Sequence, residues 1–501
     1  MNIIDCHIHS MACRNYQEEI DRLISHMEQN GISQAVISDL GDNWMAFPDK
    51  DTLMTANSRL RDAALDSNGK LAFLVYINPQ LSDWREVFDR FINDACGVKL
   101  WISLRTPEYG MERTKDVLRA AEQYGKAVLI HTFDRTDPGP CGAIGVQDLI
   151  ELANAVPGCR IVAAHAGGNW RKCIARAGEI PENVCFDISG SYPERTMVSR
   201  LTAAFGEDRI LYGSDAYGRS FASQLSKVAY AGLDDAQMEK ILYYNSRKTF
   251  GLPESTPVHA AEKTAFNTED DRKDNFCFAE KGKYFDHEVS VSMISDHAEK
   301  HQMSAVFAAS LNALTCDDKI AGNQQYLQAC TGYSRIFPLA AVDLKNMPEA
   351  LLQLESINKF AGVIISPYLH NYKLEYEAFS QFFDACAERS IPVWINTALG
   401  DDRFRPEELH SRCVSADEIT AFVSSAPQNS YVFQGCTELV KLSNALPEYC
   451  KLECSKLSDG EYLPEEFRAK GNVERLCFGS EYPFRDYGEV ADVLSGRRFF
   501  S

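Results

Sequence analysis

Four of the five histidines in the first half of the sequence stand where a short apolar run ends, and these positions could bind a metal ion. His7 and His9 end the first such run, and His131 and His165 end two later ones. Side chains two apart in a strand point to the same face, so His7 and His9 can share one ion. Asp215 follows another apolar run. Imidazole and carboxylate ligands suit Zn²⁺ and neighbouring divalent ions, so we expect these five residues to form one metal site.

Positively charged and aromatic residues follow the same runs. Arg105, Arg135 and Arg219 each come a few residues after the end of a run, and a guanidinium matches a carboxylate in geometry and charge. Because the chain carries a formal net charge of −20, three such arginines favour an anionic substrate. Trp170 could line the same pocket, or it could pack in the interior.

The apolar runs alternate with amphipathic helical stretches, which is typical of parallel βαβ units. Eight units in about 250 residues is the count of a (β/α)₈ barrel, although periodicity alone also fits a doubly wound sheet. Barrel active sites lie at the carboxyl ends of the strands, where the histidines stand. The predicted strands are Ile3–His9, Ala35–Ser38, Leu71–Ile77, Gly97–Trp101, Ala127–His131, Ile161–His165, Val184–Ile188 and Ile210–Ser214.

The second half of the sequence repeats the first. With 501 residues, the chain has room for two such barrels, so we expect the fold to be α/β with two tandem (β/α)₈ TIM-like barrels. We predict a metal-binding barrel over residues 1–252, a polar linker over 253–275 and a second barrel over 276–501. The repeat pairs Ile4–Ser10 with Phe285–Val291, Gly97–Trp101 with Gly362–Ser366, Ala127–Thr132 with Pro392–Thr397, Ile161–Gly168 with Tyr431–Glu438, and Ile210–Tyr217 with Leu476–Pro483.

This pairing leaves the second barrel without an imidazole at any predicted ligand position. We therefore expect a degenerate copy that packs against the first barrel and has lost its chemistry; a separate ligand-binding role is the alternative. The replacements are His7 by Glu288, His9 by Ser290, Lys99 by Ile364, His131 by Asn396, His165 by Gly435 and Asp215 by Glu481.

Several motifs of the first half together resemble the amidohydrolase superfamily, in its branch of amidohydrolase-related, TIM-barrel metal-dependent hydrolases. They span nearly all of residues 1–252. The matching segments are Asp5–His9, Gly97–Leu100, His131, Ala164–Gly168, Gly213–Asp215 and Asn245–Leu252.

The resemblance implies a role for each of these site residues. His7, His9, His131 and Asp215 would hold a divalent metal, with Zn²⁺ first and one ion or two, and His165 would orient or polarise the substrate. Asp215 would be the general base for a metal-activated water.

Lys99 has three interpretations. Contact with the substrate comes first, and a lysine that only covers the barrel rim comes second. Carboxylation, which in some members of the family lets a lysine bridge two metals, comes third.

The expected function is metal-dependent hydrolysis of a small polar amide, lactone or ester that bears a carboxylate. The alternative is a non-oxidative decarboxylase or other carbon–carbon lyase of the same superfamily. A binding or scaffold protein fits the second half but not the first. Short connections after most strands favour the hydrolase, because they leave little room for an aromatic-acid pocket.

Composition narrows the partners and the compartment. The charge of −20 disfavours nucleic acid and anionic membranes, and no run of about 18 apolar residues could span a bilayer. Sixteen scattered cysteines without a CxxC pair are read as reduced thiols. With no secretory signal in the sequence, we expect a cytoplasmic protein that binds a small molecule.

Overall fold

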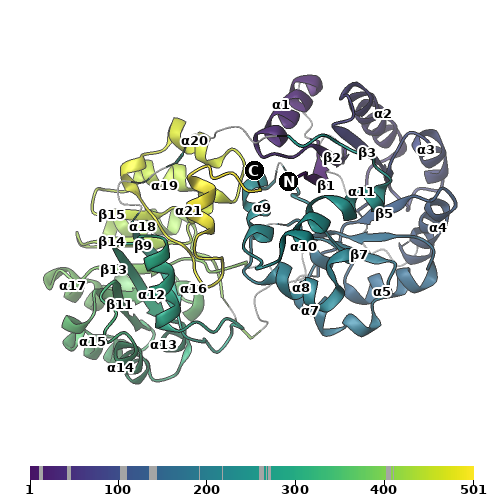
Figure 1. The fold of residues 1–501 in the computed structure, drawn as a ribbon. Helices are drawn as coiled ribbons and strands as arrows, with labels where there is room; N and C mark the ends of the chain where they lie inside the picture. The colour runs from purple at the N-terminus through teal and green to yellow at the C-terminus, as the bar shows by residue number, and fades with distance from the viewer. Residues whose placement is uncertain are drawn as a thin grey trace. The chain divides into compact units, whose positions relative to one another are not determined.

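Two parallel sheets of eight strands each form the centre of this computed structural model (Figure 1). In the first sheet, β1 to β8 lie in chain order and every neighbouring pair is parallel. The structure describes residues 1–500 except 11–14, 42–46, 102–109, 135–143, 191, 217, 259–264, 267, 269–271, 402–407 and 410.

Hydrogen bonds between the first and last strands bring the first sheet close to a complete barrel. The backbone N–H of Cys6 donates to the carbonyl of Tyr212 at 3.0 Å, and Ile8 forms a parallel bridge with Ala216. The predicted (β/α)₈ class is therefore confirmed. The strands are β1 (Ile4–His9), β2 (Gln34–Ser38), β3 (Leu71–Ile77), β4 (Gly97–Leu100), β5 (Ala127–Ile130), β6 (Ile161–Ala163), β7 (Val184–Asp187) and β8 (Ile210–Leu211).

The helices of the first barrel form where an apolar face can cover these strands. In the first helix, Ile20, Leu23 and Met27 are buried at helical spacing, and the Asn15 side chain caps the start by accepting from the N–H of Glu18. The helices are α1 (Tyr16–Gln29), α2 (Lys50–Asp66), α3 (Trp84–Phe91), α4 (Gly110–Gln123), α5 (Val146–Ala155), α6 (Ala164–Gly167), α7 (Trp170–Ala175), α8 (Met197–Phe205), α9 (Phe221–Ala229), α10 (Asp235–Glu239), the π-helix η3 (Lys240–Tyr244) and α11 (Asn245–Phe250).

The second barrel repeats this plan. Its end strands also meet, since the N–H of Phe278 donates to the carbonyl of Tyr482 at 2.8 Å. Its strands are β9 (Lys273–Ala279), β10 (Ala305–Ser310), β11 (Ile336–Val342), β12 (Gly362–Ile365), β13 (Val393–Asn396), β14 (Tyr431–Gln434), β15 (Cys450–Glu453) and β16 (Leu476–Cys477). Its helices are α12 (Val291–Lys300), α13 (Leu311–Thr315), α14 (Lys319–Ala329), α15 (Met347–Glu355), α16 (Pro367–His370), α17 (Ser380–Glu388), α18 (Ala416–Ser425), α19 (Leu439–Ala445), α20 (Leu463–Lys470) and α21 (Glu489–Leu494).

The first strand of the second barrel differs from the predicted one. β9 begins at Lys273, inside the stretch predicted to be a linker, whereas residues 285–290 form no strand and Val291 begins α12. The carboxylate of Asp5 accepts from the N–H groups of His7 and Ser214, and the carboxylate of Asp274 accepts in the same way from Phe276 and Ser480. Asp274 is therefore the counterpart of Asp5.

It follows that two of the predicted replacements are wrong. His7 corresponds to Phe276 and His9 to Phe278, not to Glu288 and Ser290, because β9 carries an Asp-x-Phe-x-Phe pattern where β1 carries Asp-x-His-x-His.

The described chain divides into two compact units whose bounds are not simply sequential. One comprises Met1–Lys263 together with Arg497–Ser501, and the other comprises Thr264–Gly496. The end of the chain lies beside its start, since the N-terminal amino group of Met1 donates to the carbonyl of Phe500 at 3.1 Å (Figure 1). Phe499 is buried.

Within the described residues, no helix is long and apolar enough to cross a bilayer. The cysteines of this same part of the chain are all free thiols.

Candidate metal centre

His7 and His9 end β1 with their rings together inside the barrel. Their Nε2 atoms lie 3.1 Å apart, and both side chains are almost completely buried. The Nδ1 atom of His9 lies 2.8 Å from the Ser38 hydroxyl at the end of β2. Burial, reinforced by the charge of Lys99, holds the pKa of both imidazoles well below the ordinary value. Both rings are therefore neutral at pH 7, which is the form that binds metals.

Asp215 brings a carboxylate to the same two nitrogens. Its Oδ1 lies 3.5 Å from Nε2 of His9 and 4.0 Å from Nε2 of His7. The residue has a left-handed backbone, with φ of 62°, and its N–H donates to the carbonyl of His7 at 2.8 Å. This backbone bond fixes the corner after β8 so that the carboxylate faces the histidine pair.

The ligand atoms of His7, His9 and Asp215 all lie within 4.8 Å of one another. Two imidazoles and a carboxylate are a typical ligand set for a divalent transition ion, and the neutral state of the imidazoles suits that role. The residues present therefore fit the metal that the sequence predicts.

Lys99 of β4 enters the same space. Its Nζ donates to Nε2 of His7 at 2.8 Å, and its side chain is buried. Burial lowers the pKa of the ammonium to about 8, and the carboxylates of Asp215 and Asp187 act in the opposite direction. The lysine thus reaches the centre of the site; whether it contacts substrate or is carboxylated stays a prediction.

His131 and His165 complete a cluster of four imidazoles. Nε2 of His165 lies 3.1 Å from Nδ1 of His131, and the ring of His165 is 5.2 Å from that of His7. His165 is not in the strand, as the sequence suggested; it lies in the short turn α6 after β6, with φ of 55°. The structure brings all five predicted ligands and Lys99 to one end of the barrel.

Two residues at the end of β7 were missed by the sequence analysis. Oδ2 of Asp187 lies 2.9 Å from Nδ1 of His7, and its Oδ1 accepts from the backbone N–H of His165 at 3.0 Å. The Ser189 hydroxyl lies 2.9 Å from Nδ1 of His7 and 3.1 Å from Nδ1 of His165. A carboxylate on the outer nitrogen of a ligand histidine fixes its tautomer and orientation.

The second barrel keeps this supporting arrangement without the histidines. Glu453, at the end of β15, accepts from the N–H groups of Gly435 and Ser455, as Asp187 does from His165 and Ser189. The matching bonds make Glu453 the counterpart of Asp187.

A different arrangement stands where the second barrel would hold its ion. Glu481, the counterpart of Asp215, is fully buried, and Nζ of Lys456 lies 3.3 Å from its carboxylate. The Phe276 and Phe278 rings, 5.6 Å apart, occupy the positions of the histidine pair. The Lys456 ammonium therefore neutralises the charge of Glu481 in the second barrel, whereas a bound ion would neutralise the charge of Asp215 in the first.

The predicted substrate-binding residues are only partly described. Arg105 and Arg135 lie outside the described residues. Arg219 is half-buried and donates from Nη1 to the carbonyl of Gly218. Trp170 is buried, with its Nε1 donating to Glu194 at 2.7 Å and the guanidinium of Arg171 4.2 Å from its ring centre. These contacts are those of a packed interior residue, and a role for Trp170 in substrate binding stays a prediction.

Comparison with known proteins gives one family and a set of similar folds. Residues 4–252 match the family described as Amidohydrolase. No curated protein sequence is similar enough to this chain to count as a relative.

Among solved structures, a 2,6-dihydroxybenzoate decarboxylase from Rhizobium matches 50% of this chain and 98% of its own, with 15% identity and a TM-score of 0.42. A manganese-bound dihydroxybenzoic acid decarboxylase from Polaromonas matches 50% of this chain and 97% of its own, with 15% identity and a TM-score of 0.41. A Staphylococcus aureus protein described as a candidate amidohydrolase matches 50% of this chain and 100% of its own, with 17% identity and a TM-score of 0.40.

Proposed function

Because residues 4–252 belong to the amidohydrolase family, we propose that the first barrel is a metal-dependent hydrolase of a small polar amide, lactone or ester that bears a carboxylate. The observation that carries the proposal is the meeting of His7, His9 and Asp215 around one point, with Lys99 beside them. Neutral imidazoles, a carboxylate and an ammonium are the groups that such a reaction uses.

His7, His9 and Asp215 would hold the ion, with His131 and His165 as the further predicted ligands and Zn²⁺ as the first choice of metal. A bound divalent ion supplies Lewis acidity, which polarises a substrate oxygen and makes water a stronger acid. The chain's own groups do the remaining work.

Asp215 is the group suited to take and return a proton. Among His7, His9 and Asp215, the Asp215 side chain is the most exposed, at 19%, whereas the side chains of His7 and His9 are only 1% and 3% exposed. A carboxylate that faces both the ligand nitrogens and the barrel mouth can accept a proton from water and pass it to the leaving group.

Lys99 and His165 are suited to hold the substrate. An ammonium in a buried site attracts a carboxylate or a developing oxyanion more strongly than it would in water. Lys99 Nζ lies 2.8 Å from Nε2 of His7, and the His165 ring lies 5.2 Å from the His7 ring, so both residues are close enough to contact a substrate bound beside His7.

A carbon–carbon lyase, acting as a non-oxidative decarboxylase, is the second candidate. The buried Lys99 ammonium beside neutral imidazoles favours it, because this cluster would hold the carboxylate that such a reaction removes. Asp215 would then first take a proton from water and deliver it to the carbon that has lost CO₂.

The experiment that tests the proposal combines metal analysis with product detection on the full chain. We expect at least one first-row divalent ion per chain. In His7→Ala and in Asp215→Ala, either the ion should be lost or turnover should be abolished. A library of lactones and esters should release protons without CO₂, and a library of amides should release an amine and a carboxylate without CO₂. Release of CO₂ from carboxylates would favour the lyase, and unchanged metal and turnover in both variants would contradict the site itself.

We also propose that the second barrel is a degenerate copy that supports the first without holding a transition metal. The replacement of the histidine pair by Phe276 and Phe278, and the Lys456–Glu481 pair, support this proposal. A cytoplasmic location and a small anionic substrate belong to the same proposal, and the charge of −20 disfavours nucleic acid and anionic membranes as partners.

A further inference from the structure

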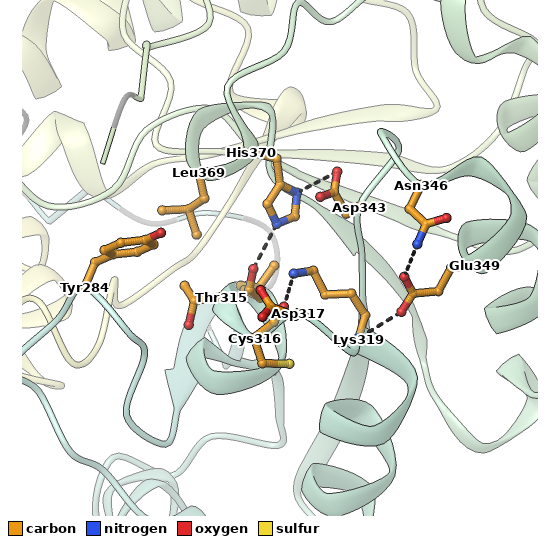
Figure 2. Close-up of a pocket in the computed structure, with 11 residues that line it drawn as sticks. Tyr284, Thr315, Cys316, Asp317, Lys319, Asp343, Asn346, Glu349, Leu369 and His370 are labelled. Carbon is orange, nitrogen blue, oxygen red and sulfur yellow. Dashed lines mark hydrogen bonds and ion pairs between the residues drawn. The ribbon is translucent and has the colours of Figure 1, made fainter. Parts of the chain in front are cut away.

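A polar cavity of about 280 Å³ opens in the second barrel, and neither Lys456 nor Glu481 is among its lining residues (Figure 2). Its lining residues all follow the carboxyl ends of β9, β10, β11 and β12, which is the rim where barrels bind their ligands. Tyr284, Thr315, Lys319, Asp343 and His370 are among them. The cavity therefore lies on the functional face of a barrel whose central site has been replaced.

His370, at the end of α16, has one ring nitrogen without a hydrogen-bond partner among the described residues. Its Nε2 lies 2.9 Å from the carbonyl oxygen of Leu314, so Nε2 must carry the proton. Its Nδ1 is buried and makes no hydrogen bond, although the side chain is only 7% exposed. In the neutral ring, Nδ1 is thus an unsatisfied acceptor.

The group nearest that nitrogen is a second acceptor. Oδ1 of Asp343 lies 3.6 Å from Nδ1 of His370, and the same oxygen accepts from the backbone N–H of Lys345 at 3.0 Å. Burial lowers the pKa of His370, against the attraction of Asp343, which disfavours an imidazolium as the source of the missing proton. Two acceptors therefore face each other and need a donor from elsewhere.

The charges around the cavity indicate what kind of donor would be bound. Asp317, Asp343 and Glu349 line it against one cation, Lys319. The Lys319 ammonium is already used, since its Nζ donates to the carbonyl of Cys316 at 2.5 Å. Glu349 is used as well, accepting from the N–H of Lys319 and the amide of Asn346. Asp343 keeps 23% of its side chain exposed and so remains reachable.

We propose that this cavity binds a small organic ligand through an ammonium group, with Asp343 as its counter-ion and Nδ1 of His370 as its second acceptor. An ammonium carries three N–H donors and a positive charge, so it satisfies both acceptors and offsets the excess of carboxylates. A divalent metal fits less well: the described groups of three ligand atoms within reach of one ion all lie in the first barrel. An anionic ligand would meet two uncompensated acceptors.

The test is a calorimetric titration of the full chain with ethylammonium chloride. Tetramethylammonium is the matched control with the same charge and no N–H group, and ethanol is the neutral donor. We expect saturable binding of ethylammonium, with both controls weaker by about tenfold or more. Equal affinity for tetramethylammonium, or no saturable binding of ethylammonium, would overturn the proposal.

Variants place the binding in this cavity. Asp343→Asn should weaken ethylammonium binding by about tenfold or more, and His370→Phe should weaken it as well. Glu355→Gln, an equal charge change on the exposed end of α15, should leave it unchanged. Circular dichroism and the unfolding midpoint would check that each variant is folded.

Unweakened binding in folded Asp343→Asn protein would contradict the assignment. So would ring-nitrogen NMR shifts that show His370 doubly protonated in the free protein at pH 7, because the missing donor would then be internal. Binding of Mn²⁺ or Zn²⁺ that is lost in His370→Phe would show that the cavity is a metal site, and would overturn the proposal of an ammonium ligand.

Discussion

At the scale of single residues, the site divides into groups that meet at its centre and groups that hold them. The strand-end position and rarity of histidine made the first kind predictable from the sequence. Asp187 and Ser189 could not be singled out in the same way, because serine and aspartate are common and their function here is contact with His7 and His165. The observed strand β7 ends at Asp187, whereas the predicted strand ran to Ile188, so the strand-end rule applied to the histidines missed Asp187 by one position.

We expect Asp187→Asn to weaken metal binding by about 10- to 100-fold. The carboxylate at 2.9 Å keeps the proton of His7 on Nδ1, so that Nε2 keeps its lone pair for the metal. An asparagine amide there could donate to Nδ1 and move the proton to Nε2. Competition against a metal chelator would measure the change, with Asp208→Asn, on an exposed ion pair, as the control. Unaltered affinity would show that His7 is oriented without Asp187.

Glu453 should make the stability of the second barrel depend on pH. Burial, and then the charge of Glu481, raise its pKa from 4.5 to about 8 in the folded protein. A carboxyl whose folded pKa lies above its unfolded pKa takes up a proton on folding between those two values. Its contribution is therefore fully present below pH 4.5 and is lost as the pH rises through about 8.

Denaturant unfolding of the full chain between pH 5 and pH 9 would measure this effect. We expect the parent to lose stability over that range, by on the order of a few kcal/mol in the second barrel. Glu453→Gln, which cannot titrate, should show a flatter profile over the same range. Parallel profiles for parent and variant would mean that Glu453 is ionised in the folded state.

At the scale of elements, the alternating apolar runs predicted all eight strands of the first barrel to within a few residues. They failed at the first strand of the second barrel, where Phe285–Val291 imitates the spacing of polar residues in β1. The true counterpart, β9, has aromatic rings at both histidine positions, so only the hydrogen bonds of Asp5 and Asp274 identify it. Sequence similarity was lost at the residues that define the motif.

Restoring the histidine pair in β9 should not restore a metal site. In a Phe276→His, Phe278→His double variant, Glu481 remains paired with Lys456. Two imidazoles buried without partners should also destabilise the second barrel by about 2 kcal/mol or more. Metal analysis in an Asp215→Ala background would isolate the new site. A stoichiometric ion there would show that the aromatic rings alone had removed the function.

Glu481→Gln should destabilise the second barrel while leaving the metal content of the first unchanged. Glu481 is fully buried beside Lys456, and loss of one partner leaves the other charge uncompensated. Removal of one member of a buried pair costs about 3–5 kcal/mol, although the carboxylate of Asp459 also attracts the Lys456 ammonium and can offset part of this cost. Urea unfolding and metal analysis of the same sample would test both parts. Lost metal binding would contradict the independence of the two sites.

At the scale of the whole molecule, two barrels were predictable from length and repetition, but the course of the chain between them was not. The sequence predicts a single boundary between the two barrels, whereas in the structure Arg497–Ser501 belongs to the unit that begins at Met1. Nothing in the composition of these five residues marks them as part of the first unit. Their place follows from tertiary contacts such as that of Met1 with Phe500.

Phe499→Ala should therefore weaken the first unit and not the second. The phenylalanine side chain is buried, and truncation of a buried phenylalanine costs about 3–5 kcal/mol when the surroundings cannot close. Added metal should raise the unfolding midpoint of the first unit and so identify its transition. Arg498→Ala, at an exposed neighbour, is the control. A shift in the other transition alone would assign the terminal residues to the second unit.

The second unit is joined to the first at both of its ends, like a domain inserted into a host. When it is folded, its two ends are held together, since the N–H of Phe266 donates to the carbonyl of Leu494 at 2.7 Å. When it unfolds, the docked terminal residues close a long flexible loop, which costs entropy. Folding of the insert and docking of the terminal residues must therefore favour each other. Any ligand that stabilises the second barrel then also favours docking of the last few residues on the first barrel. The stabilities of the two barrels are therefore coupled through the chain that connects them.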